Sequence, residues 1–318
     1  MFSKYNYVYQ VYKERNFTRA AENLYISQPS LSVAIKNIER KIGADLFERM
    51  GTTVKLTEIG EEYIATAKQI IAAETDFLNR INDINNLKKG KVVVGGTNYL
   101  SSYVLPRVIN RFNRLYPDIE VELVEANSYN LSNMVNNEQV DIIIDSFDEI
   151  PDDYQGVFLA SEDILLCVPK DREINEKLKK YQIKPESIYN GSVSLMDVEG
   201  VPMEIFKNEK FILLKKGNDM CKRAMKFFNE ENIEPNVIYR VDQLNISYAL
   251  ADSGIGLCFI TDTFFKYGRG SDNVLLYKVK NEQYNRNLYV AYKKNRYCTK
   301  AMEEFIKVTK EILGDSVN

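Results

Sequence analysis

The chain has 318 residues, about twice the ~150 residues usual for one domain, so we expect at least two folding units. Its residues are 45% hydrophobic and 27% charged, which is typical of globular proteins and excludes collagen-like, disordered and membrane-embedded classes. The sequence contains no histidine, and this excludes Ser-His-Asp and Cys-His catalysis and HExxH metal sites.

The cysteines do not indicate a metal site. Cys167, Cys221, Cys258 and Cys298 are widely spaced and form no CxxC pair, so we expect reduced thiols, no metal and no cofactor. The first residues carry charges in every turn, unlike a secretory signal, and no run approaches ~18 apolar residues. We therefore expect a cytoplasmic protein without membrane contact.

The charge is distributed unevenly along the chain. Residues 1–55 contain nine Lys and Arg against five Asp and Glu, a net charge of +4, whereas the whole chain carries −3. The remaining residues therefore carry −7. A basic end on an acidic body suggests that the N-terminal part contacts a polyanion.

Three short helices are expected at the N-terminus. Tyr5, Val8 and Tyr12 recur at helical spacing and predict a first helix over 5–13. Thr18 is a suitable N-cap for a second helix over 18–25. Ser27 suits the N-cap of a third, because the following proline is tolerated in a first turn. Residues 46–56 then predict two short strands, so that residues 1–58 form a winged helix-turn-helix.

The start of the third helix has the chemistry for reading base edges in a major groove. Gln28 can pair with adenine through two hydrogen bonds, serines can donate to several bases, and Val33 can touch a thymine methyl group. Basic residues nearby can contact phosphates. The candidate DNA-binding residues are Arg19, Ser27, Gln28, Pro29, Ser30, Ser32, Val33, Lys36, Arg49, Thr53 and Lys55, with Arg40 and Lys41 as further phosphate contacts.

This N-terminal stretch resembles the signature of LysR-type transcriptional regulators. Two positions depart from the family pattern: Thr52 and Val33 stand where the family often has basic or Gln-like residues, which suggests fewer ionic contacts per subunit. The matching residues are Phe17-Thr18-Arg19-Ala20-Ala21-Glu22, Leu24, Ile26-Ser27-Gln28-Pro29-Ser30-Leu31-Ser32, Ile35, Ile38-Glu39, Gly43, Leu46-Phe47-Glu48-Arg49, Leu56-Thr57 and Gly60.

Residues 59–89 predict one long amphipathic linker helix. Thr57 opens it, and acidic residues occupy its first turn, where the helix dipole favours them. Its apolar positions run too long for a helix of a small domain and fit pairing with a second copy. They include Ile59, Tyr63, Ala67, Ile70, Ile71, Phe77, Leu78, Ile81, Ile84 and Leu87.

Residues 90–318 alternate between strand and helix patterns, which predicts a doubly wound α/β effector-binding domain. We expect lobe I at 90–163 and 270–318, including a strand at 274–279, and lobe II at 164–269, with a cleft between them. This region resembles the effector-binding region of the same regulators, whose lobes are similar to periplasmic binding proteins. The expected fold is therefore α/β overall, with an all-α winged helix-turn-helix at the N-terminus.

The cleft is expected to hold a small effector. Ligands of doubly wound sheets bind at the carboxyl ends of strands and at helix N-termini. Neither GxGxxG nor GxxxxGK[ST] follows the first strand, which argues against a nucleotide. By analogy with the family, an effector carboxylate or other polar group would be held by Thr97, Asn98 and Ser101. The further candidates are Ser128, Ser146, Phe147, Gly217, Asn218, Gln243 and Asn245.

The resemblance implies a homodimer that assembles to a homotetramer, binds an interrupted inverted repeat in double-stranded DNA, and recruits RNA polymerase under control of an effector such as an organic or amino acid. Two alternatives remain. A two-lobed solute-binding protein would carry a signal peptide and no DNA-binding end. An enzyme whose N-terminal domain serves only assembly would need a catalytic cluster of Asp, Glu, Lys, Tyr or Cys, and no motif indicates one.

Overall fold

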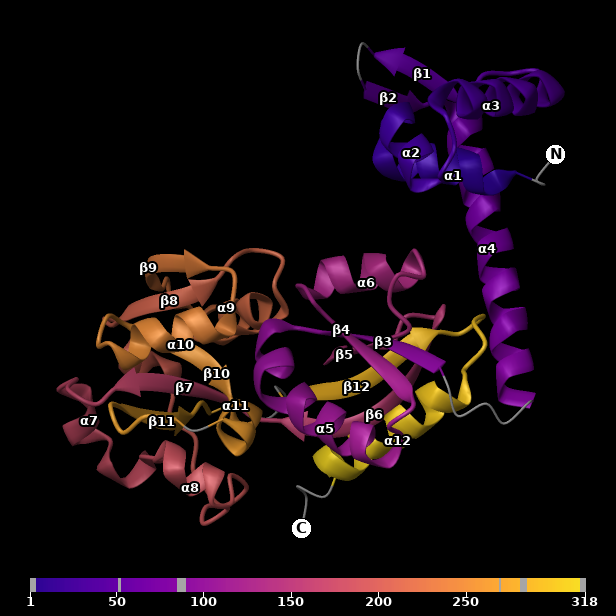
Figure 1. The fold of residues 1–318 in the computed structure, drawn as a ribbon. Coiled ribbons are helices and arrows are strands. Elements are labelled where there is room, and N and C mark those ends of the chain that lie inside the picture. Colours follow the sequence, from indigo (N-terminus) through magenta and orange to yellow (C-terminus); the bar gives the residue numbers. More distant parts are fainter. Residues whose placement is uncertain (1–3, 51–52, 85–89, 269, 281–284, 315–318) are drawn as a thin grey trace. The chain divides into compact units, whose positions relative to one another are not determined.

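The computed structural model describes residues 4–50, 53–84, 90–268, 270–280 and 285–314 (Figure 1). The chain divides into two compact units, residues 1–81 and 82–318, and each is described by itself. Within the described residues, no helix has the length and apolar character needed to cross a membrane.

The N-terminal unit is the expected winged helix-turn-helix. Three helices, α1 (Tyr5–Glu14), α2 (Phe17–Asn23) and α3 (Gln28–Ile42), are followed by an antiparallel hairpin of β1 (Phe47–Met50) and β2 (Thr53–Leu56). Their shared core is built from Val8, Ala21, Leu31 and Ile35, which are at most 2% exposed. The narrow alanine face of α2 lets the helices approach closely, as a helix-turn-helix requires.

The helix starts agree with the sequence in one case and differ in another. Ser27 caps α3 as expected, because its side chain accepts a hydrogen bond from the Ser30 N–H at 3.3 Å. The expected Thr18 cap of α2 was wrong. Asn16 has extended backbone and caps this helix, since its Oδ1 accepts from the N–H groups of Thr18 and Arg19 at 2.9 and 3.1 Å.

A single long helix, α4 (Glu58–Ile84), follows the wing. Its first turns belong to the core of the unit through Tyr63, Ile64 and Ala67. Gly60 allows this packing, because a Cβ atom there would lie 2.1 Å from the carbonyl oxygen of Leu46. The expected linker helix ended at residue 89, and its last part, 85–89, lies outside the described residues.

Lobe I of the second unit is a mixed sheet in the order β4-β3-β5-β12-β6. Alternate residues of β5 point to opposite faces, so Ile142 and Ile144 join the core on one face and Ile143 the core on the other. In Figure 1, α5 and α12 cover one face and α6 covers the other. The elements are β3 (Gly90–Gly96), η1 (Leu100–Val104), α5 (Leu105–Leu115), β4 (Ile119–Glu125), α6 (Ser128–Asn136), β5 (Ile142–Ser146), β6 (Tyr154–Glu162), β12 (Arg286–Lys293) and α12 (Lys300–Gly314).

Lobe II is a second five-stranded sheet in the order β11-β7-β10-β8-β9. Its strands are β7 (Ile164–Pro169), β8 (Lys210–Leu214), β9 (Asn236–Val241), β10 (Leu257–Thr261) and β11 (Val274–Lys278). Its helices are α7 (Ile174–Lys177), η2 (Lys179–Tyr181), α8 (Pro185–Tyr189), η3 (Met203–Phe206), α9 (Asp219–Glu230), α10 (Leu244–Asp252) and α11 (Asp262–Tyr267).

One strand lies in a different lobe from the one expected. The sequence placed the strand at 274–279 in lobe I, but β11 pairs antiparallel with β7 of lobe II, with Leu276 opposite Cys167. The two lobes are therefore joined between β6 and β7 and again between β11 and β12. The error has a physical reason: β11 is almost wholly buried and apolar, and such a strand fits the interior of either sheet equally well.

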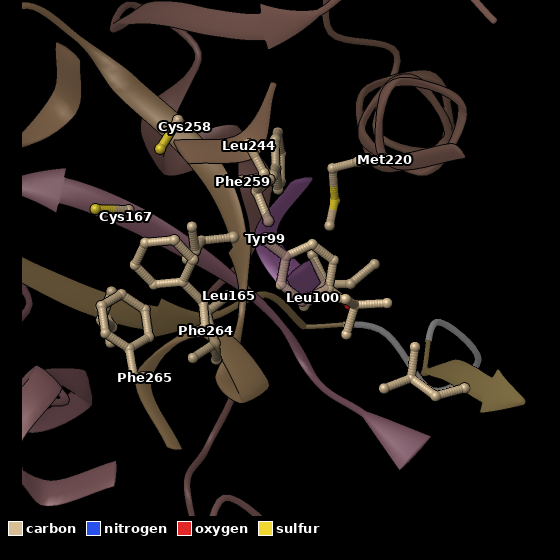
Figure 2. Close-up of a cluster of buried hydrophobic side chains, with 14 of the residues drawn as sticks. Tyr99, Leu100, Leu165, Cys167, Met220, Leu244, Cys258, Phe259, Phe264 and Phe265 are labelled. Carbon is tan, nitrogen blue, oxygen red and sulfur yellow. The ribbon is translucent and has the colours of Figure 1, made fainter. Parts of the chain in front are cut away.

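The core of lobe II contains three of the cysteines, Cys167, Cys221 and Cys258, and Figure 2 shows the first and the last. Cys167 and Cys258 are opposite each other on β7 and β10, both are 0% exposed, and neither forms a disulfide. Phe259 and Phe264 pack in the same core. Burial raises the pKa of the Cys167 thiol well above its ordinary value, so this pair behaves as inert core residues.

Candidate functional site

The exposed face of α3 carries four of the candidate DNA-binding residues. Pro29, Ser30, Val33 and Lys36 are exposed; the first two lie in the first turn of the helix, and Lys36 lies near its middle. Val33 is 59% exposed, although an apolar side chain of this size would normally be buried. An exposed apolar residue among polar ones is the composition expected of a surface that contacts base edges.

The other candidates at the start of α3 are held by local hydrogen bonds. Gln28 is half-buried, and its Nε2 donates to the Ser32 Oγ at 2.9 Å. The hydroxyl oxygens of Ser27 and Ser30 lie 2.7 Å apart. These hydrogen bonds fix the side chains at the first turn of the helix. In a complex, each side chain could exchange its hydrogen bond within the protein for one to a DNA base.

The candidate phosphate contacts are distributed around this helix. Arg19 on α2 and Lys55 on β2 are exposed. Arg49 and Thr53 belong to the two strands of the wing, where Arg49 is opposite Val54 and Thr53 is opposite Met50. The side chains of Arg49 and Thr53 are outside the described part of the chain. Arg40 and Lys41 are exposed in the last turn of α3, where cations also favour the helix dipole.

A small pocket lies between the two lobes of the second unit. Its walls come from the ends of β3, β8 and β9 and from the N-termini of α6 and α9, as expected for a doubly wound sheet. Its volume is ≈ 40 Å³, room for only a few water molecules. The lining residues are Thr97, Asn98, Tyr99, Ser128, Leu214, Asn218, Asp219, Met220, Asp242, Gln243, Leu244 and Arg286.

Five of the ten effector candidates line this pocket. They are Thr97, Asn98, Ser128, Asn218 and Gln243. The other five candidates do not line the pocket. The Ser101 hydroxyl donates to the Gly96 carbonyl, Ser146 bonds Asp219, Phe147 packs against Tyr289, and Asn245 donates to Ser102. Gly217 has no side chain and occupies the turn before α9 with φ +94°.

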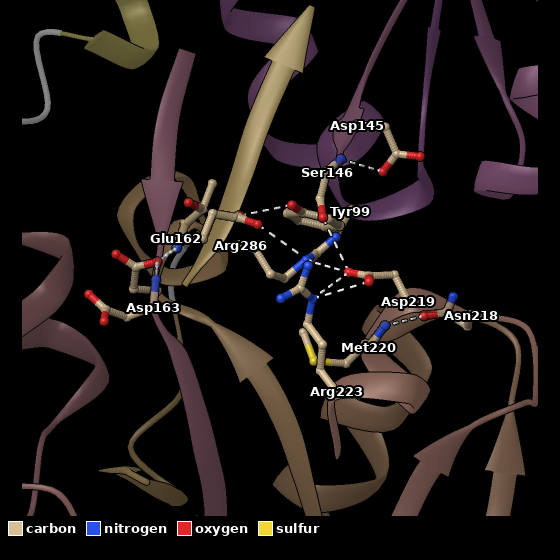
Figure 3. Close-up of polar contacts among 12 residues, drawn as sticks. Tyr99, Asp145, Ser146, Glu162, Asp163, Asn218, Asp219, Met220, Arg223 and Arg286 are labelled. Atoms are coloured by element: carbon tan, nitrogen blue, oxygen red, sulfur yellow. Dashed lines mark hydrogen bonds and ion pairs between the residues drawn. The ribbon is translucent and has the colours of Figure 1, made fainter. Parts of the chain in front are cut away.

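The charged centre of the pocket was missed by the sequence analysis. Arg286, at the start of β12, is 5% exposed and lies between two carboxylates (Figure 3). Its Nε is 3.0 Å from the Oδ2 of Asp219, and its Nη1 is 3.4 Å from the Oε2 of Glu162. Glu162 is 0% exposed and also accepts a hydrogen bond from the Tyr99 hydroxyl at 2.8 Å. The guanidinium lies 5.9 Å from the centre of the Tyr99 ring.

The pKa shifts of Asp219 and Tyr99 show how these charges are balanced. Burial disfavours the ionised carboxylate of Asp219, but Arg286 and Arg223 outweigh it and hold the pKa of Asp219 below its usual value. Burial raises the pKa of Tyr99 well above its ordinary value, and the nearby Glu162 raises it further. Asp219 is therefore an ionised carboxylate with its positive partners already in place, and Tyr99 is a neutral donor.

Polar contacts from α9 and α10 join the two lobes beside the pocket. Asp219 accepts a hydrogen bond from the Ser146 hydroxyl of lobe I at 3.2 Å. Arg223, one turn later, forms an ion pair with Asp148 of lobe I and with Asp219 at 2.9 Å. On α10, the Asn245 side chain donates to Ser102 of lobe I at 3.3 Å. Movement of the lobes would therefore change the pocket and these contacts together.

Two observations bear on what the site can hold. The Thr97 Oγ1 is buried and has no hydrogen-bond partner among the described residues, which leaves it available to a ligand. The described residues contain no group of three or more Cys, Asp or Glu side chains placed to hold a metal ion.

Comparisons with known proteins agree with both halves of the chain. Residues 2–61 match the family model "Bacterial regulatory helix-turn-helix protein, lysR family", and residues 85–314 match "LysR substrate binding domain". The chain is a member of the LysR family of transcriptional regulators. It thus consists of a DNA-binding winged helix-turn-helix followed by an effector-binding domain.

Relatives of the same length support this assignment. The chain is 28% identical over 312 residues to an uncharacterised transcriptional regulator, YcgK of Bacillus subtilis, and the match covers 96% of this chain and 93% of that one. Two solved structures share the fold over almost the whole chain. A full-length, singly substituted OxyR from Pseudomonas aeruginosa has a TM-score of 0.66 at 18% identity, covering 98% and 97% of the two chains. CbnR complexed with its target DNA has a TM-score of 0.62 at 16% identity, covering 100% of both.

Proposed function

We propose that α3 reads base edges through Gln28, Ser30, Ser32 and Val33, and that Arg19 and the wing hold the DNA backbone. The exposed face of α3 carries this proposal, because it presents the apolar Val33, 59% exposed, among polar side chains. A regulator that binds chromosomal DNA acts in the cytoplasm. By analogy with the family, the DNA-bound regulator recruits RNA polymerase.

The roles of base reading and phosphate contact are separable by substitution. We expect Gln28→Ala to weaken binding to the preferred sequence by about 5- to 100-fold and binding to scrambled DNA little, because a lost bidentate contact costs about 1–3 kcal/mol. Lys55→Ala should weaken binding to both and reduce the slope of log affinity against log salt by about one per subunit. The measurement is fluorescence anisotropy over a salt series.

The preferred sequence is first obtained by selection from a random duplex library with the full chain. Gln69→Ala on α4 is the control, since Gln69 is exposed and distant in sequence from the DNA-binding residues. Equal losses on preferred and scrambled DNA for Gln28→Ala would rule out a base-reading role for this side chain.

We further propose that the effector is a small zwitterion such as an amino acid. The carboxylate of Asp219 already occupies the position beside Arg286 and Arg223 where an effector anion would bind most strongly. The unpartnered Thr97 hydroxyl is the free donor of this wall, with Asn98 and the N-terminus of α6 beside it. Asp242 on the opposite wall, whose present partner is the exposed Lys215 at 2.7 Å, would face an ammonium group.

This proposal is tested by melting the full chain with matched ligands. Each amino acid is compared with the 2-hydroxy acid and the primary amine that share its side chain. One amino acid should raise the melting temperature by mass action, whereas neither analogue should match it. Thr97→Val should abolish the shift and retain the fold, because its hydroxyl has no partner among the described residues, and the exposed Asn110→Ala should keep the shift. A 2-hydroxy acid that stabilises as strongly as its amino acid would contradict the ammonium site.

The assembly we propose is a homodimer formed through α4, two of which form a homotetramer. Its support is the exposed apolar row Phe77, Leu78 and Ile81 in the second half of the helix, with exposed fractions of 62%, 60% and 39%. A dimer with a twofold axis would recognise an interrupted inverted repeat. We infer no catalytic role, because the charged side chains of the pocket are already paired: Asp219 with Arg286, and Asp242 with Lys215.

A further inference from the structure

The turn between α2 and α3 exposes a tyrosine that no interaction within the protein explains. Tyr25 is 96% exposed, the largest exposed fraction of any large hydrophobic residue in the described ranges. Its ring and hydroxyl form no contact or hydrogen bond with another described residue. A side chain with an extensive apolar surface that could be buried is instead exposed to solvent.

The backbone of Tyr25 is also strained. Its φ is +54°, in the left-handed region that glycine and asparagine tolerate best. The turn imposes this conformation, since the Tyr25 N–H donates to the Glu22 carbonyl and the Ile26 N–H to the Ala21 carbonyl, each at 3.0 Å. The other three non-glycine residues with positive φ in the described parts are the polar Arg15, Glu138 and Asn232. Glycine or asparagine would therefore make a more stable turn at this position.

The position of Tyr25 suggests what it does. It lies two residues before Ser27, the N-cap of α3, and so beside the end of the helix that carries the candidate base contacts. The strands of a duplex border the major groove with phosphates, so a donor beside the helix start is placed to reach a phosphate oxygen. The exposed ring extends the phenol O–H outward from the turn.

We propose that Tyr25 is a DNA-contacting residue whose hydroxyl donates a hydrogen bond to a backbone phosphate beside the groove entered by α3. This inference rests on the proposed mode of DNA binding through α3. The contact is sequence-independent, because every nucleotide offers the same acceptor. It is also uncharged on the protein side, so it releases no counterion and differs in this respect from the contact proposed for Lys55.

The test separates the hydroxyl, the ring and the backbone. Tyr25→Phe removes only the hydroxyl, and we expect about tenfold weaker binding to both the preferred and the scrambled duplex with an unchanged salt slope. Tyr25→Asn relieves the strained turn. It should raise the melting temperature of the N-terminal unit by about 4 °C in calorimetry of the full chain and weaken binding at least as much. Glu138→Asn is the matched control, because it relieves a left-handed residue in the other unit and should leave DNA binding unchanged.

Each result decides the question. Wild-type affinity in both Tyr25 variants would overturn the inference and leave the role of α3 intact. Wild-type affinity in Tyr25→Phe with a loss in Tyr25→Asn would overturn the hydrogen bond, and a lower melting temperature in Tyr25→Asn would show that the ring is structural. If the wild-type chain selects no sequence from the library, the proposed function itself fails.

Discussion

Replacing Arg286 by methionine is expected to lower the free energy of unfolding of the effector-binding unit by about 3–5 kcal/mol. Arg286 is the cation between Glu162, which is 0% exposed, and Asp219. Removal of the guanidinium leaves the buried Glu162 charge uncompensated, and the cost of desolvating it is then not offset. Urea unfolding of the full chain at neutral pH, followed by tyrosine fluorescence, measures the loss.

A surface ion pair provides the control for this substitution. Arg111 pairs with Glu311 at 3.2 Å, with side chains 57% and 54% exposed, and Arg111→Met should change stability by no more than about 0.5 kcal/mol. The double variant Arg286→Met, Glu162→Gln should recover much of the loss, since it removes the unpaired charge as well. Comparable destabilisation by Arg286→Met and Arg111→Met, or no recovery in the double variant, would contradict the buried ion pair.

The N-terminal unit was largely predictable because its information is local. Helical spacing, the Ser27 cap and the turn before it lie within a few residues of one another, and a cap is recognised from adjacent residues. Even there, the predicted cap was Thr18, whereas the structure has Asn16 two positions earlier, with extended backbone, as the cap. The exposed Tyr25 could not be identified, since a tyrosine in a turn reads as an ordinary partly buried aromatic residue.

The pocket was predictable only in part. The rule that ligands bind at the carboxyl ends of parallel strands, together with the family analogy, gave ten candidates, of which Thr97, Asn98, Ser128, Asn218 and Gln243 line the pocket. That they bind an effector stays a prediction. Arg286 and Asp219 were missed because their pairing joins residues distant in the sequence, across two lobes whose strand order the sequence does not specify. The only sequence feature that could have indicated this charged centre is Arg286 itself, a single arginine that begins an apolar strand.

The misplaced strand had a related cause. β11 and β12 are consecutive and both apolar, yet they belong to different sheets, so the crossing between lobes falls in the short segment that joins them. Arg286 stands at the first position of β12, immediately after this crossing. The misplaced lobe boundary and the omitted Arg286 therefore concern neighbouring parts of the chain.

Substitution of the exposed apolar row of α4 is expected to produce the largest loss of DNA affinity. Ile70 and Phe77, like Ile71 and Leu78, are seven residues apart, the spacing at which two helices pair. The double variant Phe77→Gln, Leu78→Gln should be monomeric, and its affinity for an inverted repeat should fall by about 10²- to 10⁴-fold because the second half-site no longer benefits from linkage. Its affinity for a single half-site should remain that of the wild type.

Sedimentation equilibrium and anisotropy on one and two half-sites measure the two effects separately. Ala65→Gln, an exposed position on the opposite face of the same helix, is the control and should remain dimeric with full affinity. Glutamine favours helices, so a loss in the double variant reports the apolar contact and not the melting of α4. A double variant that stays dimeric would assign pairing to another surface. A monomer that still binds the full repeat with wild-type affinity would show that twofold recognition does not depend on assembly.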